Sequence, residues 1–95
     1  MNIAICDYDI RMAGQIEHLV DTVFGGNKNK YHCVTLLSAD ELLRYVKDEA
    51  AEFQIYLLDI EMKGTDGLES AEMIRQRDDA AIIMFITSHA ELRPK

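Results

Sequence analysis

The sequence is poor in several features, and each scarcity excludes a class of protein. Basic residues number 10 against 17 acidic ones, so at a net charge of −7 the segment lacks the positive patch needed to grip nucleic acid or an anionic membrane surface. No apolar run approaches the length of a membrane span, and the first residues lack a secretory signal. The two cysteines, Cys6 and Cys33, lie in apolar runs, which favours free thiols in a reducing cytoplasm over a disulfide. We find no repeat, low-complexity stretch or internal linker.

The residues that are present suit one small domain spanning 1–95, since 48% of them are apolar. Short apolar runs at 3–6, 31–37, 53–60 and 81–87 are typical of buried strands. Helical spacing separates them at 10–24, from a Ser38–Glu41 capping box to about 49–51, and from an Asp66 cap to Asp78. This alternation predicts an α/β fold with a parallel sheet and right-handed crossovers.

The first predicted helix carries its apolar residues on one stripe. Ile16, Leu19, Val20 and Val23 follow the i, i+3, i+4, i+7 pattern of an amphipathic helix that packs on a core. Asp9 precedes this helix and is interpreted as its N-cap, because a short carboxylate can accept hydrogen bonds from the first free N–H groups.

Polar side chains follow three of the predicted strands at their carboxyl ends. Asp7 follows the first strand, Asp59 lies near the end of the third, and Thr87 with Ser88 ends the fourth. Functional groups of parallel sheets gather at this edge. Clustered carboxylates repel one another unless a hard cation such as Mg²⁺ lies among them. One carboxylate could then form an acyl phosphate while a hydroxyl binds a phosphoryl oxygen, so the pattern indicates a phospho-aspartate site.

Three segments carry a resemblance to a known family. Residues 3–7, the run Leu-Leu-Asp-Ile-Glu-Met within 57–69, and the run Phe-Ile-Thr-Ser-His within 82–89 together resemble a receiver domain of a two-component response regulator. The last two runs look most like regulators of the LytTR type. The resemblance implies a flavodoxin-like (CheY-like) sheet in the order 2-1-3-4. It also implies a truncated receiver, without the family's last strand and last two helices.

The resemblance also implies roles for individual residues. Asp59 matches the phosphoacceptor, which takes a phosphoryl group from a histidine kinase, and Thr87 matches the switch hydroxyl. Asp7, Asp59 and the backbone carbonyl of Glu61 match the Mg²⁺ ligands. Tyr8 departs from the family, since a second acidic ligand is expected there and a neutral phenol is a poor ligand for Mg²⁺. The family's phosphate-pairing lysine has no counterpart in this sequence.

Other interpretations of the same residues remain open. The Tyr8 substitution and the truncation favour a degenerate receiver that binds a kinase or another receiver without accepting phosphate. The stretch around Asp59 also has a faint similarity to haloacid-dehalogenase-like phosphatases, although only 36 residues follow that aspartate. Without a neighbour on its outer side the fourth strand becomes an apolar edge, which predicts self-association through that strand.

Overall fold

The computed structural model describes residues 1–24, 31–48, 52–60 and 67–86. Strands and helices alternate along them as β1 (Asn2–Cys6), α1 (Ile10–Val23), β2 (His32–Leu36), α2 (Ala39–Lys47), β3 (Ile55–Asp59), α3 (Gly67–Arg77) and β4 (Ile82–Ile86). This is the order that the sequence predicts. No helix in the described ranges is long and apolar enough to cross a membrane.

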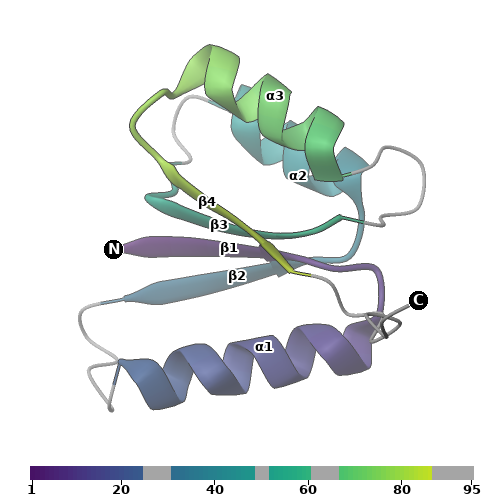
Figure 1. The fold of residues 1–95 in the computed structure, drawn as a ribbon, viewed down its shortest axis with the longest axis vertical. Helices are drawn as coiled ribbons and strands as arrows, with labels where there is room; N and C mark the ends of the chain where they lie inside the picture. The colour runs from purple at the N-terminus through teal and green to yellow at the C-terminus, as the bar shows by residue number, and fades with distance from the viewer. Residues whose placement is uncertain (25–30, 49–51, 61–66, 87–95) are drawn as a thin grey trace, which may run out of the picture.

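The four strands form one parallel sheet in the order β2-β1-β3-β4 (Figure 1). At the carboxyl edge Cys6 pairs with Leu36 on one side and with Leu58 on the other, and Asp59 pairs with Ile86. The predicted sheet order is therefore confirmed. Because all strands run the same way, residues that follow β1 and β3 meet at the same edge.

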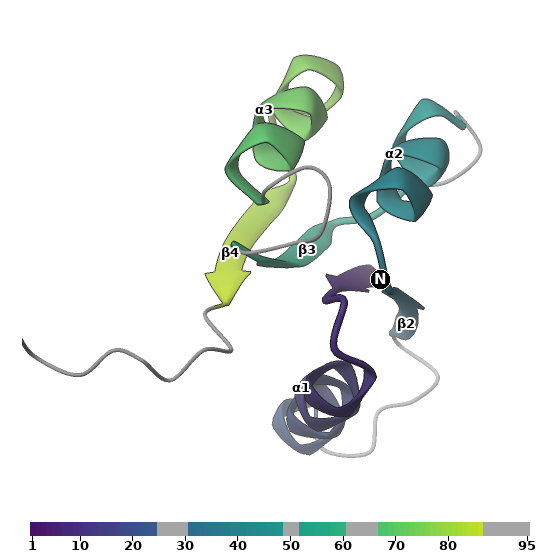
Figure 2. The same cartoon turned by 90° about the vertical axis from the view of Figure 1, so that its right-hand side faces the viewer.

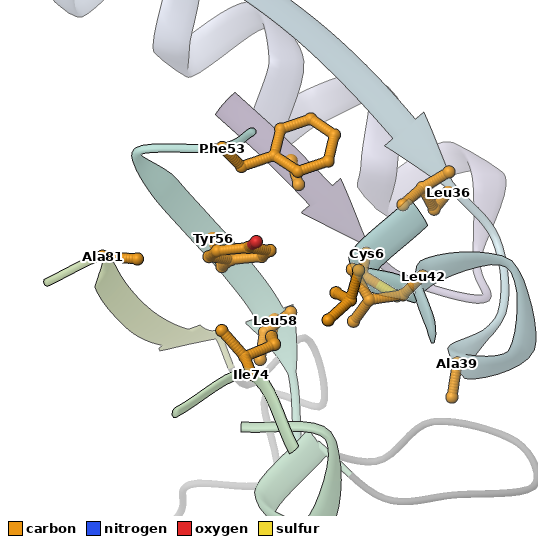
Figure 3. Close-up of a cluster of buried hydrophobic side chains, with 11 residues drawn as sticks. Cys6, Leu36, Ala39, Leu42, Phe53, Tyr56, Leu58, Ile74 and Ala81 are labelled. Carbon is orange, nitrogen blue, oxygen red and sulfur yellow. The ribbon is translucent and has the colours of Figure 1, made fainter. Parts of the chain in front are cut away.

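Helices cover the two faces of the sheet. α1 lies on one face, whereas α2 and α3 lie on the other (Figures 1 and 2). The buried residues form two clusters accordingly, because alternate residues of a strand point to opposite faces. Ile3 and Ile5 pack with Ile16 and Val20 on the α1 side. On the other side the larger cluster contains Ala4, Cys6, Leu36, Ala39, Leu42, Val46, Phe53, Tyr56, Leu58, Ile74 and Ala81 (Figure 3).

The predicted stripe on α1 is buried along only half of its width. Ile16 and Val20 face the core, but Leu19 and Val23 are exposed, Val23 by 77%. These two residues lie on the flank of α1 that lines an open apolar groove with Met84 and Ile86. Within the described residues no element packs over that groove, so helical spacing alone overestimated how much of α1 is buried.

Element ends differ from the sequence boundaries by a few residues. α2 ends at Lys47 rather than near 49–51, because the backbone of Asp48 is extended. The N–H of Asp48 donates to the carbonyls of Arg44 and Tyr45 at 3.2 and 3.1 Å and so caps the end of the helix. Residues 49–51 lie outside the described ranges. β4 lies at the sheet edge, as expected for a strand without an outer neighbour, and it exposes apolar side chains. Both cysteines are free, as predicted.

Candidate functional site

Asp7 and Asp59 lie side by side at the carboxyl edge of the sheet. Asp7 directly follows β1 and Asp59 is the last residue of β3, the strand paired with β1. The exposed fraction is 0% for Asp7 and 1% for Asp59, so both residues are buried. The convergence that the sequence predicts for these two residues is thus present in the structure.

Backbone hydrogen bonds hold Asp7 in place. Its N–H donates to the Leu36 carbonyl at 3.0 Å, which ties it to the end of β2. Its Oδ1 atom accepts from the N–H of Asp9 at 2.9 Å. One carboxylate oxygen is used in this tight turn, and the other, Oδ2, is buried and has no hydrogen-bond partner among the described residues.

Asp9 is committed to α1 rather than to the site. Its Oδ1 atom accepts from the N–H groups of Arg11 at 3.0 Å and Met12 at 3.4 Å, which is the N-cap role that the sequence predicts. Tyr8, between the two aspartates, is 42% exposed. Asp9 therefore does not replace the carboxylate that Tyr8 lacks.

The start of α3 packs directly against Asp59. The N–H of Gly67 donates to the Ile60 carbonyl at 2.9 Å. A Cβ atom at Gly67 would collide with the backbone oxygen of Asp59 and lie 2.9 Å from Cα of Ile60. Glycine is therefore required here by close approach, and the sequence pattern, which placed Gly67 only in a turn, did not reveal this contact.

Ser70 is a second feature that sequence reasoning missed. It lies on the same buried face of α3 as Gly67 and Ile74, is fully buried, and its Oγ atom has no hydrogen-bond partner in the part of the chain that the structure describes. A small residue three positions after Gly67 is the only signal that could have marked this face, since i and i+3 positions share one side of a helix.

Burial dominates the electrostatics of the aspartate pair. Removal from water raises the pKa of Asp7 to about 6, and the hydrogen bond from Asp9 acts in the opposite direction. The negative charge of Asp59 and a hydrogen bond between the two carboxyl groups raise that pKa further. Asp7 therefore holds a proton more readily than an isolated carboxyl group does.

The neighbouring thiol is inert for the same reason. Burial raises the pKa of Cys6 to about 12, and the charges of Asp7, Glu41 and Asp59 add to the effect. Its Sγ atom lies 3.5 Å from the Ser38 carbonyl, to which it can donate. Cys6 is thus a packing residue of the core and not a nucleophile.

The donor chemistry of the pair fits a hard cation. The two carboxylates are suitable Mg²⁺ ligands, and the Oδ2 atom of Asp7 is buried without a hydrogen-bond partner among the described residues. In the described part of the chain no group of three or more His, Cys, Asp or Glu side chains is placed to hold a metal. The expected backbone ligand Glu61 and the expected switch residue Thr87 lie outside the described residues.

One comparison with known proteins identifies a family. Residues 4–94 match the family model described as the response regulator receiver domain. A search of curated proteins gave no match.

Three solved structures illustrate the similarity. A CheY-like receiver protein from Methanospirillum hungatei is 23% identical with a TM-score of 0.76, over 96% of this chain and 66% of that one. The N-terminal domain of a three-domain response regulator from Carboxydothermus hydrogenoformans is 24% identical with a TM-score of 0.78. The match covers 100% of this chain and 70% of that one. The response regulator TrrA from Thermotoga maritima, solved in complex with Mg²⁺ and BeF, is 27% identical with a TM-score of 0.67. The match covers 97% of this chain and 73% of that one. The present chain therefore spans about two thirds of the length of the first of these relatives.

Proposed function

The chain belongs to the response regulator receiver domain family, and from that premise we propose that Asp59 accepts a phosphoryl group from a histidine kinase. A receiver domain is a signalling module and not an enzyme, so the dehalogenase-like phosphatase interpretation is set aside. The observation that carries the proposal is the buried pair of Asp7 and Asp59 at the carboxyl edge of the sheet.

The chemistry follows from the position of Asp59. A carboxylate oxygen of Asp59 attacks the phosphorus, a P–O bond forms, and the P–N bond to the kinase histidine breaks with the electron pair leaving on the imidazole. The close approach of Gly67 to the backbone of Asp59 helps to fix the end of β3, which carries that carboxylate. Asp7 stays beside it as the second acidic group.

A divalent cation completes the proposed site. Asp7, Asp59 and the backbone carbonyl of Glu61 would hold Mg²⁺, as the structure of TrrA with Mg²⁺ and BeF suggests by family analogy. When bound, Mg²⁺ offsets the negative charge that gathers on the transferred group. Thr87 supplies the switch hydroxyl in this proposal. Because Tyr8 adds no charge to the set, we expect weaker Mg²⁺ binding than a site with three carboxylates would give.

The finer identity of the domain is part of the proposal. The run of residues at 57–69 supports a regulator of the LytTR type, in which residues 1–95 belong to the receiver and transcription is the process under control. Phosphotransfer from a histidine kinase would place the domain in the cytoplasm. The surplus of acidic residues leaves direct contact with nucleic acid or membrane to other partners.

Self-association through β4 is a further part of the proposal. Among the described residues β4 pairs with β3 on one side and with no strand on the other, so its outer row of backbone N–H and C=O groups offers a template for another strand. The side chains of Ile82, Met84 and Phe85 on this strand are exposed, the first two on one face of the sheet and Phe85 on the other. A second copy could pair there about a two-fold axis and bury them.

Intact-mass spectrometry after incubation with acetyl phosphate and Mg²⁺ tests the phosphoacceptor proposal. We expect one phosphoryl adduct on the parent protein and none on Asp59→Asn, which keeps the size of the side chain but not its nucleophilic oxygen. A folded parent protein that gains no adduct, or an Asp59→Asn variant that gains the same adduct, would contradict it.

One specific observation favours a second candidate function. Tyr8 occupies the expected ligand position, and Asp9 is held as a helix cap, so among the described residues the site carries two carboxylates, and burial raises the pKa of one of them, Asp7. A receiver of this kind could bind a kinase or another receiver without accepting phosphate. A folded parent protein without adduct, which still binds a histidine kinase in pull-down, would identify this second function.

A further inference from the structure

The edge of the sheet that holds the aspartate pair also exposes large apolar side chains. Leu37 directly follows β2 and is 37% exposed, and Leu68 lies in the first turn of α3 and is 54% exposed. Tyr8, which follows β1, is exposed as well. This edge faces the viewer in Figure 2, which shows α2 and α3, two helices in contact with each other, on one face of the sheet. A partner that covers these side chains would remove apolar area from water.

The first turns of α2 and α3 place negative charge at the same edge. Asp40 and Glu41 lie in the first turn of α2 and Glu69 in that of α3, and all three are exposed. Carboxylates here stabilise the helices, because the amino end of a helix carries partial positive charge. They also give the α2–α3 side of the edge a negative potential, whereas the first turn of α1 has no acidic residue and carries Arg11.

The burial of Asp59 determines which kind of partner uses this edge. Only 1% of the residue is exposed, so a phosphoryl group bound to a histidine of another protein reaches its carboxylate only when the two protein surfaces meet at the carboxyl edge. A protein donor therefore covers side chains around Asp59. A small donor such as acetyl phosphate reaches the same carboxylate without covering them.

On the premise of the proposed function, in which Asp59 is the phosphoacceptor, we propose that Leu37 and Leu68 form the docking surface for a histidine kinase, together with the carboxylates in the first turns of α2 and α3. The kinase surface that fits is apolar and carries basic side chains around its histidine. Apolar contact supplies affinity, and the opposite charges speed the encounter. Ile10, exposed at the start of α1 on the other face of the sheet, lies outside this surface.

Two phosphoryl donors with one acceptor test the docking surface. Leu37→Ser and Leu68→Ser should each slow transfer from an autophosphorylated histidine kinase about fivefold at sub-saturating acceptor, since each removes apolar contact area. The kinase is chosen from a purified panel for its transfer to the parent protein. Labelling by acetyl phosphate, followed by intact mass, should remain as in the parent and also reports that the site is folded. Val23→Ser is the matched control, because it removes an exposed apolar residue at the far end of α1, and it should alter neither rate.

The results separate the docking surface from the phosphoacceptor function. A folded parent protein that gains no adduct from acetyl phosphate would refute both. An adduct from acetyl phosphate would leave the phosphoacceptor intact, and kinase transfer unaltered by the two leucine variants, or no transfer from any kinase in the panel, would then overturn the docking surface alone. Slower transfer to Ile10→Ser but not to the leucine variants would place the kinase on α1 instead. Weaker dimerisation of the leucine variants in analytical ultracentrifugation, with kinase transfer unchanged, would assign the surface to a second copy of the chain.

Discussion

Asp7 makes the stability of the domain depend on pH, because its pKa differs between the folded and unfolded chain. In the unfolded chain it ionises near 3.8, and in the folded domain near 6. Between these values the folded state holds more protons, so the free energy of unfolding falls as pH rises from about 4 to about 6. At neutral pH without metal, the charged and buried Asp7 therefore costs about 2–3 kcal/mol of stability.

Asp7→Asn should remove this cost, since the amide is neutral and its oxygen can still accept from the N–H of Asp9. In EDTA at about pH 7.5, urea unfolding should show the variant to be more stable than the parent by about 2–3 kcal/mol. At about pH 4.5 the difference should shrink to half or less. A difference that stays constant across this pH range would contradict the assignment of the titration to Asp7.

Tyr8 governs the charge of the proposed cation site. Tyr8→Asp adds a carboxylate next to Asp7 and should tighten Mg²⁺ binding about tenfold, measured by calorimetric titration. Tyr8→Asn is the matched control, because it removes the ring to the same extent and adds no charge. If both variants bind Mg²⁺ no better than the parent, the identity of residue 8 does not limit the site.

Gly67 and Gly14 form a natural pair for a test of close approach. A Cβ atom at Gly67 would strike the backbone of Asp59 and Ile60, whereas one at Gly14, inside α1, would meet nothing within 4 Å. Gly67→Ala should lower the free energy of unfolding by about 1–3 kcal/mol, and Gly14→Ala should raise it by about 0.5–1 kcal/mol. Urea unfolding of the two variants checks the opposite signs, and equal effects would show that the strand end of β3 tolerates displacement.

At the level of whole elements, the sequence predicted what depends on local periodicity. The alternation of four strands and three helices, the Asp9 cap and the Ser38 cap are all present, and Ser38 Oγ accepts from the Glu41 N–H at 3.2 Å. The convergence of Asp7 and Asp59 was predictable as well, because parallel strands place their carboxyl ends together. These features follow from residue spacing and turn chemistry alone.

What the sequence could not predict depends on the environment of each element. Leu19 and Val23 obey the helical spacing of a buried stripe, yet they are exposed because within the described residues no element packs on that flank of α1. The contact of Gly67 with Asp59 and the raised pKa of Asp7 both arise from distances across the fold. Periodicity holds no information on such distances, so they had to come from the structure.

On the scale of the molecule, the sheet has two edges that differ in character. β2 at one edge is flanked by α1, and polar side chains line this edge, with the Tyr31 hydroxyl donating to Asp21 at 2.6 Å and Thr35 to Glu17 at 3.0 Å. β4 at the other edge exposes large apolar residues instead. Charged and polar side chains protect an edge strand from pairing, so the unprotected β4 edge is the one from which self-association is expected.

Met84 provides the test of that expectation, because it is 55% exposed near the middle of β4. The parent protein should form dimers in a concentration-dependent manner by analytical ultracentrifugation, and Met84→Lys should weaken the dimer by about tenfold or more through charge repulsion across the paired edge. Val23→Lys is the matched control, since it places the same charge on α1, in the groove that Met84 also lines, and not on β4 itself. A monomeric parent would refute self-association. Equal loss of the dimer in both variants would move the contact from the β4 edge to the groove beside α1.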